Sequence, residues 1–168
     1  MSLEPIAKEI YCVLIALVDD TLLLPNAAIA ETVGQEALTV NESEPLWVAG
    51  ELQWNRRALT VIRYETLNGA AHAPLTRRAR LVVLQALDAE TTASPLALVA
   101  QSYPHLITVT RDAIAPLPLR PGDDPAVVLA RVRVGNSEAL IPNLDAMRQR
   151  VNNLLDPSVD PSVVASEG

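Results

Sequence analysis

The amino-acid sequence predicts a mostly β protein built from small barrels. Short apolar runs separated by turn residues occupy most of the chain, which is typical of strands joined by hairpins. Residues 127–134 alternate most clearly, with valine or alanine on one face and Arg131 and Arg133 on the other. Few helical segments lie between these runs, so a parallel sheet with crossover helices is not expected.

The first half of the chain predicts two β-hairpins, because polar turn residues interrupt each pair of apolar runs. Asp19-Asp20 closes the first hairpin, and Asn55-Arg56-Arg57 closes the second. The expected strands are residues 9–18, 21–24, 47–54 and 58–64.

A short helix is expected between these hairpins. Residues 26–33 are rich in helix formers, with Asn26 as a suitable N-cap and Gly34 as the stop. The i,i+4 spacing of Ile29 and Val33 would place both on one side of a helix of about two turns.

The second half repeats this pattern and ends in a longer helix. Four prolines in residues 115–125 exclude a helix interior or a central strand there. Asn143 is a suitable cap for a helix over 143–155, whose apolar residues fall on one stripe. The expected strands are residues 80–87, 96–101, 106–110, 127–134 and 138–141.

The chain is expected to fold as one domain over residues 1–155. A connection at residues 67–76 would divide it into lobes of similar plan, 9–75 and 76–155, with a shared core. Residues 156–168 contain two Asp-Pro-Ser-Val units and predict a disordered tail.

Composition restricts the possible functions. The net charge of −7 argues against nucleic-acid binding, which needs clustered lysine and arginine. Apolar runs stay shorter than the roughly 18 residues of a spanning helix, and the first residues do not resemble a signal peptide. We therefore expect a cytoplasmic protein without direct membrane insertion. Cys12 is the only cysteine and is expected to be buried and inert.

The sequence carries no recognisable catalytic, metal or cofactor motif. His72 and His105 each lack a second ligand at short spacing, and the glycines do not form a phosphate-binding loop. Ser102, His105 and Asp112 lack the local signature of a nucleophilic site. Asp123-Asp124 is interpreted as a solvated turn rather than a metal-binding pair.

One segment resembles the signature of the CheW-like domain family. Pro45, Trp47, Val48, Gly50 and Leu52 precede a tight turn, and an aliphatic strand follows it. The resemblance extends from about residue 9 to residue 152. The supporting segments are Leu59, Val61 and Ile62, with Leu24-Pro25, Ile29, Glu31 and Val33 upstream and residues 80–84, 96–100, 115–118 and 141–147 downstream.

The resemblance implies two small five-stranded, SH3-like β-barrels and a non-catalytic scaffold. Family members bind the cytoplasmic tip of a chemoreceptor and the regulatory domain of a CheA-type histidine kinase, without a cofactor. The most similar subgroup is the pilus-associated chemosensory adaptors of the ChpC type, which points to type IV pili or twitching motility. The family's usual Leu-Arg-Gly turn is Trp54-Asn55-Arg56 here, and Arg63 replaces an acidic residue.

The candidate partner-binding residues are Trp54, Asn55, Arg56, Arg57, Ile29 and Val33. Aromatic and arginine side chains beside a tight turn are suitable interface anchors. Two interpretations stay open for each: Trp54, Ile29 and Val33 belong to the core or to an interface, and the arginines are solvated or bind a partner. The alternative functions are a small β-barrel enzyme, marked by a polar cluster around His72 or His105, and a ligand-binding barrel, marked by a deep apolar cavity.

Overall fold

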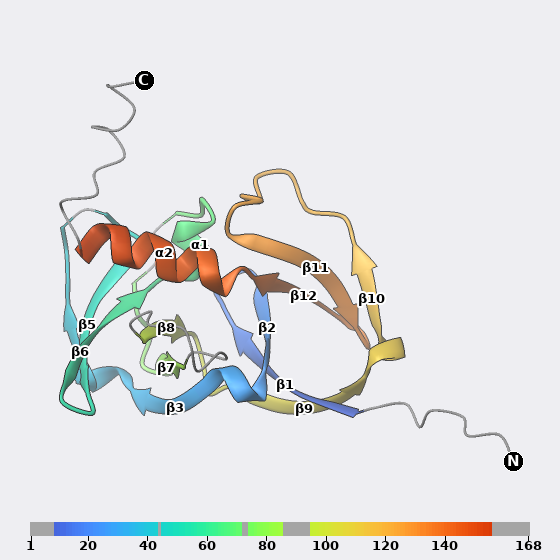
Figure 1. The fold of residues 1–168 in the computed structure, drawn as a ribbon, viewed down its shortest axis with the longest axis horizontal. Coiled ribbons are helices and arrows are strands. Elements are labelled where there is room, and N and C mark those ends of the chain that lie inside the picture. The colour runs from blue at the N-terminus through green and yellow to red at the C-terminus, as the bar shows by residue number, and fades with distance from the viewer. Residues whose placement is uncertain (1–8, 44, 72–73, 86–94, 156–168) are drawn as a thin grey trace, which may run out of the picture.

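The computed structural model describes residues 9–43, 45–71, 74–85 and 95–155 (Figure 1). The strands are β1 (Glu9–Ala16), β2 (Thr21–Pro25), β3 (Ile29–Gly34), β4 (Leu38–Val40), β5 (Val48–Trp54), β6 (Arg57–Ile62), β7 (Arg80–Leu84), β8 (Leu96–Ala100), β9 (His105–Thr110), β10 (Ile114–Leu117), β11 (Val128–Val134) and β12 (Ser137–Pro142). The helices are α1 (Tyr64–Leu67) and α2 (Leu144–Leu155), with single 3-10 turns η1 (Asn26–Ala28), η2 (Gln35–Ala37) and η3 (Arg111–Ala113).

The strands form two curled six-stranded sheets, which lie side by side in Figure 1. Sheet A has the order β10-β11-β12-β2-β1-β9, and sheet B has the order β3-β7-β8-β6-β5-β4. Neighbouring strands are antiparallel, except that β12 is parallel to β2 and β6 is parallel to β8. The prediction of a mostly β fold with two barrel-like units is confirmed, although each sheet has six strands where five were expected.

The two halves of the chain follow one plan. Each half begins with a hairpin, β1–β2 or β7–β8, continues with four strands and ends in a helix. In both halves the last hairpin closes through a two-residue turn, at residues 55–56 and 135–136, and its first strand carries a bulge. However, the leading hairpin of each half pairs with the strands of the other half, because β1 and β2 join sheet A while β7 and β8 join sheet B.

The two sheets do not coincide with the expected lobes, residues 9–75 and 76–155. Each sheet contains strands from both halves of the chain. Strand β1 pairs with β9, and β7 pairs with β3, although the members of each pair lie far apart in the sequence. The local sequence pattern predicts which residues form strands, but it does not predict which distant strands pair. That pairing is decided when the apolar faces of the strands are buried together. The predicted tail at residues 156–168 lies outside the described residues.

The helix expected over residues 26–33 is wrong. The chain makes one turn, η1, and then enters strand β3, which pairs with β7 from Ile29 opposite Leu84 to Gly34 opposite Arg80. An isolated two-turn helix is marginal in water, whereas a strand at this position gains a ladder of hydrogen bonds and suits its β-branched residues. The later helix is confirmed as α2, and the Asn143 side chain accepts a hydrogen bond from the Ala146 amide at 3.1 Å.

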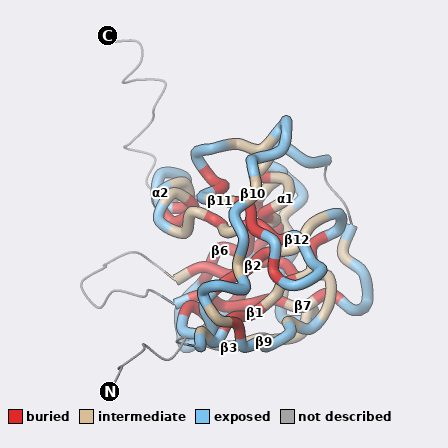
Figure 2. Tube along the Cα trace, turned by 90° about the vertical axis from the view of Figure 1, so that its right-hand side faces the viewer, coloured by how far each residue is buried: buried red, intermediate tan, exposed pale blue. Residues whose placement is uncertain are grey.

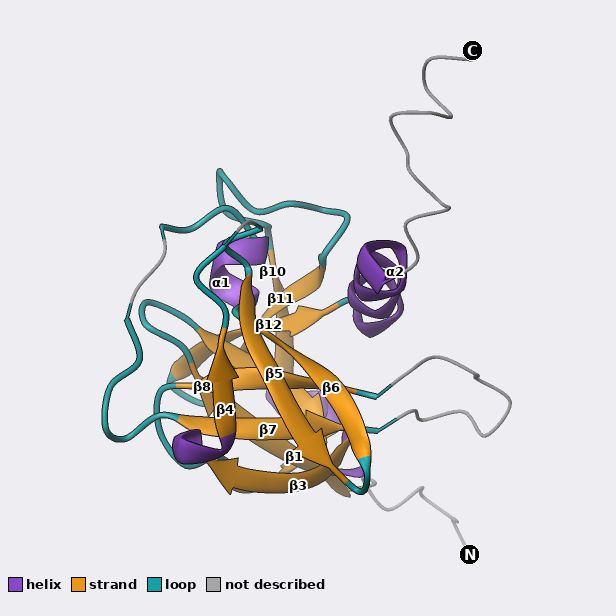
Figure 3. Cartoon of the chain, turned by 90° about the vertical axis from the view of Figure 1, so that its left-hand side faces the viewer, coloured by secondary structure: helices purple, strands orange, loops and turns teal. Residues whose placement is uncertain are grey.

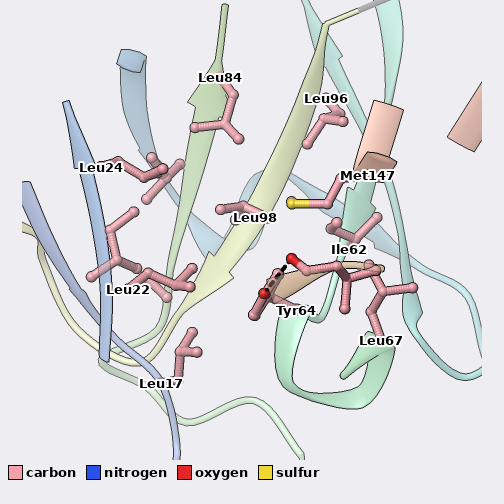
Figure 4. Packing of buried hydrophobic residues seen from close by; sticks show 14 of the residues in the cluster. Leu17, Leu22, Leu24, Ile62, Tyr64, Leu67, Leu84, Leu96, Leu98 and Met147 are labelled. Atoms are coloured by element: carbon pink, nitrogen blue, oxygen red, sulfur yellow. Dashed lines mark hydrogen bonds between the residues drawn. The ribbon is translucent and has the colours of Figure 1, made fainter. Parts of the chain in front are cut away.

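The main hydrophobic core lies between the two sheets. Figure 4 shows leucines of β2 and β8 meeting there, with Met147 of α2 and Tyr64 of α1 closing the cluster. Each sheet also has one cluster of its own on its concave side. The cluster of sheet B lies around Leu52 and Leu59, and the cluster of sheet A lies around Leu23 and Val132. Buried positions follow the central strands, while the loops at the rim are exposed (Figure 2). Full burial of each large aliphatic side chain contributes about 1.5–3 kcal/mol, so these clusters hold the sheets together.

Gly50 is required by the close approach of β4 to the bulge in β5. Its φ is 154°, and an added Cβ would lie 2.0 Å from the backbone oxygen of Thr39. We expect Gly50→Ala to cost about 2 kcal/mol or more, because the backbone oxygen cannot move away without breaking the β4–β5 ladder. Chemical unfolding followed by circular dichroism measures this loss. Gly135→Ala, at a position where an added Cβ meets nothing within 4 Å, is the control and should cost less.

Candidate functional site

The β5–β6 hairpin tip projects from sheet B and carries the predicted binding residues. Asn55 and Arg56 form the two-residue turn, with positive φ angles of 48° and 64°. Asn55, Arg56 and Arg57 are exposed, and Trp54 pairs with Arg57 across the hairpin. Two adjacent arginines therefore lie exposed at the end of the β5–β6 hairpin, on a protein whose net charge is −7.

Trp54 fixes the tip against the neighbouring edge strand. Its side chain is half-buried against the core cluster of sheet B, and its Nε1–H donates to Glu31 Oε2 of β3 at 2.6 Å. A hydrogen bond to a charged acceptor stabilises more than a neutral one. Trp54 thus combines the two interpretations left open by the sequence: it packs on the core while its polar edge stays at the surface beside the arginines.

Ile29 and Val33 lie on β3 rather than on a helix, and the structure does not bring them together as one outward patch. Both are half-buried, Ile29 against the core between the sheets and Val33 against the core of sheet B. Glu31, between them, is the exposed residue that reaches Trp54. Sequence reasoning on the hairpin did not identify Glu31 as a contact, because nothing in the local pattern relates β3 to the end of β5.

Arg56 occupies a backbone conformation that favours glycine. Turns with two positive φ angles select Asn-Gly, and a side chain at the second position costs about 1 kcal/mol. We expect Arg56→Gly to raise the free energy of unfolding by about 0.5–1 kcal/mol. Arg57→Gly, one residue later in β6, should lower it, because strand glycines lose more entropy. Urea unfolding of both variants decides this, and a stability loss in Arg56→Gly would contradict it.

A second polar cluster, which we call the arginine clasp, joins parts of the chain that are far apart in sequence. Arg131 of β11 is 3% exposed and is held by two carboxylates. Its Nε and Nη2 donate to Asp123 at 2.6 and 2.8 Å, and its Nη1 and Nη2 donate to Asp20 at 3.1 and 2.7 Å. The side-chain amide of Asn68 donates to Asp123 at 3.1 Å. The clasp ties the β1–β2 turn to the loop before β11 and to the end of α1.

The clasp corrects two expectations. The alternation of β11 places Arg131 on one face with Arg133, which is exposed, but Arg131 itself is buried in ion pairs with Asp20 and Asp123. Asp123 is not solvated, because its side chain is only 4% exposed. No sequence signal could identify the clasp, since Asp20 and Arg131 are separated by 111 residues.

Acid is expected to weaken the clasp. Hydrogen bonds from Arg131, then from the Arg120 amide and Asn68, lower the pKa of Asp123, while burial opposes this shift. The pKa of such a carboxyl is lower in the folded protein than its value of about 3.9 in the unfolded chain. The carboxylate therefore stabilises the fold fully above about pH 3.9, and this stabilisation is lost as the pH falls toward the folded pKa. The melting temperature should therefore fall steeply below about pH 4. Asp123→Asn should show a smaller fall between pH 5 and 2.5, and an equal fall would contradict the account.

A cavity of about 280 Å³ opens beside the clasp, at the junction of sheet A with α1. Leu17, Tyr64 and Leu140 form its apolar wall, and Arg120, Arg131 and several carboxylates form its polar wall. Tyr64 donates from its hydroxyl to the Val127 oxygen at 2.7 Å, and burial raises its pKa above the ordinary value. The concave sides of both sheets are filled by aliphatic side chains, so this cavity is not the interior of a ligand-binding barrel.

The histidines and the cysteine fit no catalytic arrangement in the described residues. His105 is exposed at the start of β9, and His72 lies outside the described residues. Within the described ranges, no three His, Cys, Asp or Glu side chains are grouped closely enough to hold a metal ion. Cys12 is buried as predicted, and burial raises the pKa of its thiol. None of the helices in the described part of the chain has the length and apolarity to cross a membrane.

The molecule has two curled β-sheets, each with its own hydrophobic cluster, and a core between them. It is therefore a β domain with two barrel-like units. The family model of the CheW-like domain matches residues 11–151, so the chain belongs to the CheW-like family. The crystal structure of the scaffolding protein TtCheW from Thermoanaerobacter tengcongensis has a similar fold, with a TM-score of 0.66 and 17% identity over 86% of this chain and 89% of that chain. Comparison with curated proteins gave no match.

Proposed function

We propose that this protein is a non-catalytic cytoplasmic adaptor, which joins the cytoplasmic tip of a chemoreceptor to the regulatory domain of a CheA-type histidine kinase. Membership of the CheW-like family carries the proposal, because the match spans both sheets and the helices between residues 11 and 151. The similar structure is itself described as a scaffolding protein. An adaptor of this kind transforms no substrate and needs no cofactor.

The partner-binding surface in this proposal is the β5–β6 tip with its support on β3. Arg56 and Arg57 supply exposed guanidinium groups, which bind carboxylates in a fixed fork. Trp54 and its hydrogen bond to Glu31 hold the tip in one position, so little conformational entropy is lost on binding. Ile29 and Val33 support this surface from below. Ile29 packs β3 against the core between the sheets, and Val33 packs it against the cluster of sheet B.

We further propose that the pathway controls type IV pili or twitching motility. The support is the resemblance of the sequence to the pilus-associated chemosensory adaptors, and the tip, Trp54-Asn55-Arg56, also departs from the usual Leu-Arg-Gly turn of the family. Arg56 takes the position of the turn glycine at φ 64°. A partner adapted to two adjacent arginines at this turn would distinguish the protein from adaptors of the general chemotaxis pathway.

A pull-down from lysate of the source cells, with partners identified by mass spectrometry, tests the proposal. We expect recovery of a CheA-type kinase and a chemoreceptor by the immobilised protein. Loss of both from a matched column carrying the folded Arg56→Glu/Arg57→Glu variant would assign the contact to the tip. Recovery of neither protein by the unaltered chain would refute the adaptor function.

A further inference from the structure

A second cavity, of about 340 Å³, opens where the last turn of α2 lies beside strands β4, β5 and β6. We call it the β4 groove. Val40 and Leu154, which line it, are 55% and 41% exposed, and Thr39 and Glu51 are also exposed, so a partner can reach it. Its lining includes Thr39, Val40, Val48, Glu51, Thr60 and Leu154.

A row of polar residues crosses three strands in the β4 groove. Thr39 of β4 lies opposite Glu51 of β5, and Glu51 lies opposite Thr60 of β6. Figure 3 shows these three strands side by side, with α2 next to β6. Residues directly opposite one another share a face of a sheet, and the adjacent pair Leu52–Leu59 belongs to the hydrophobic cluster of sheet B. The polar row therefore lies on the face of sheet B that points away from that cluster.

The charges at the β4 groove favour a positively charged occupant. Among the described residues that line it, Glu51 is the only charged one, and it takes part in none of the ion pairs of the described ranges. Leu154 belongs to the last turn of α2, which contains no basic residue. The carbonyl end of a helix carries a partial negative charge, which a cation stabilises. Glu51 and the end of α2 thus attract the same sign of charge.

The β4 groove also offers hydrogen bonds that the fold leaves unused. Thr60 is 8% exposed, and its hydroxyl makes no hydrogen bond to another residue that the structure describes. A buried hydroxyl without a partner costs free energy, which a ligand group bonded to it would recover. Strand β4 is the outer strand of sheet B, so one edge of its backbone has no neighbouring strand in the sheet. An extended chain can pair with such an edge.

We propose that the β4 groove binds an extended segment of a protein partner, which pairs with β4 and directs an arginine or lysine side chain to Glu51 and the end of α2. Residues 156–168 of this chain are a poor occupant, because they contain three acidic residues and no lysine or arginine. The arginines of the β5–β6 tip suit an acidic partner surface, whereas this groove suits a basic one. The inference therefore goes beyond the proposed function and does not depend on it.

The synthetic peptide acetyl-Val-Arg-Val-Arg-Val-amide is the probe that tests this site. Backbone amide shifts of the isotope-labelled full chain should change saturably at residues 38–41, 48–51 and 60. Glu51→Gln should weaken binding about fivefold, the effect of losing an ion pair of about 1 kcal/mol. Val40→Lys, which adds a positive charge at an exposed position of the outer strand, should weaken it as well. Circular dichroism confirms that both variants fold.

Two controls separate recognition of charge at the groove from the charge of the whole protein. Asp112→Asn removes one exposed negative charge on η3, outside the groove, and should bind the peptide as the parent does. The same peptide with glutamate in place of both arginines should not bind. Equal binding of the two peptides, equal affinities of Glu51→Gln and Asp112→Asn, or shifts centred on the β5–β6 tip or sheet A would overturn the inference. No saturable binding of the arginine peptide would also overturn it, and the adaptor proposal would stand unaffected.

Discussion

Arg131→Ala is expected to lower the free energy of unfolding by about 3–5 kcal/mol, because removing one member of a buried ion pair leaves the other charge buried without compensation. The substitution leaves Asp20 and Asp123 close together without their shared cation. It also releases the β1–β2 turn from Arg131 of β11 and from the loop before β11, which these ion pairs hold together. Urea unfolding followed by circular dichroism gives the loss directly.

Arg133→Ala is the matched control for this prediction, because it lies two residues further along β11. Its side chain is 54% exposed and pairs with Glu138 at 3.4 Å. Exposed ion pairs contribute between about 0 and 1 kcal/mol, so the control should stay near the parent. Similar losses in the two variants would show that the clasp adds nothing beyond an ordinary surface pair.

Charge reversal at the hairpin tip is expected to weaken partner binding by about tenfold to a hundredfold without unfolding the protein. Arg56→Glu combined with Arg57→Glu replaces attraction with repulsion against an acidic partner surface, while both positions are exposed. Titration calorimetry against the isolated kinase regulatory domain and a receptor fragment measures the change. Circular dichroism confirms folding.

Arg77→Glu combined with Arg78→Glu controls for the total charge. Both residues are exposed, and they precede the start of β7, at the end of sheet B opposite the hairpin tip. This variant should bind as the parent does, apart from a small long-range effect screened by salt. Equal loss in both double variants would mean that net charge, not the tip, governs binding.

Sequence patterns predicted the local elements of this fold better than their partners. Strand runs of the right type precede and follow Asn55-Arg56, and Asn143 caps α2 as expected. Residues 26–33 do not form the expected helix, because their alanine-rich composition favours a helix only locally, while pairing with β7 decides the outcome. The exchange of the leading hairpins was beyond prediction, because it depends on which distant apolar faces are buried together.

The candidate site was predicted in part. The turn at Asn55-Arg56 and the half-buried Trp54 follow from alternation and turn chemistry. Glu31 was missed, because its hydrogen bond to Trp54 joins β3 and β5, which are not neighbours in the strand order of sheet B. A charged residue on a strand is ordinarily solvated, so the burial of Arg131 between Asp20 and Asp123 is visible only in three dimensions.

Formation of a ternary complex tests the adaptor account most directly. Sedimentation velocity of the protein mixed with a soluble receptor-tip fragment and the kinase regulatory domain measures whether all three travel together. The account predicts one species containing all three chains, which does not form when the adaptor is omitted. Independent sedimentation of the three components, with no binary complex of the adaptor with either partner, would contradict it.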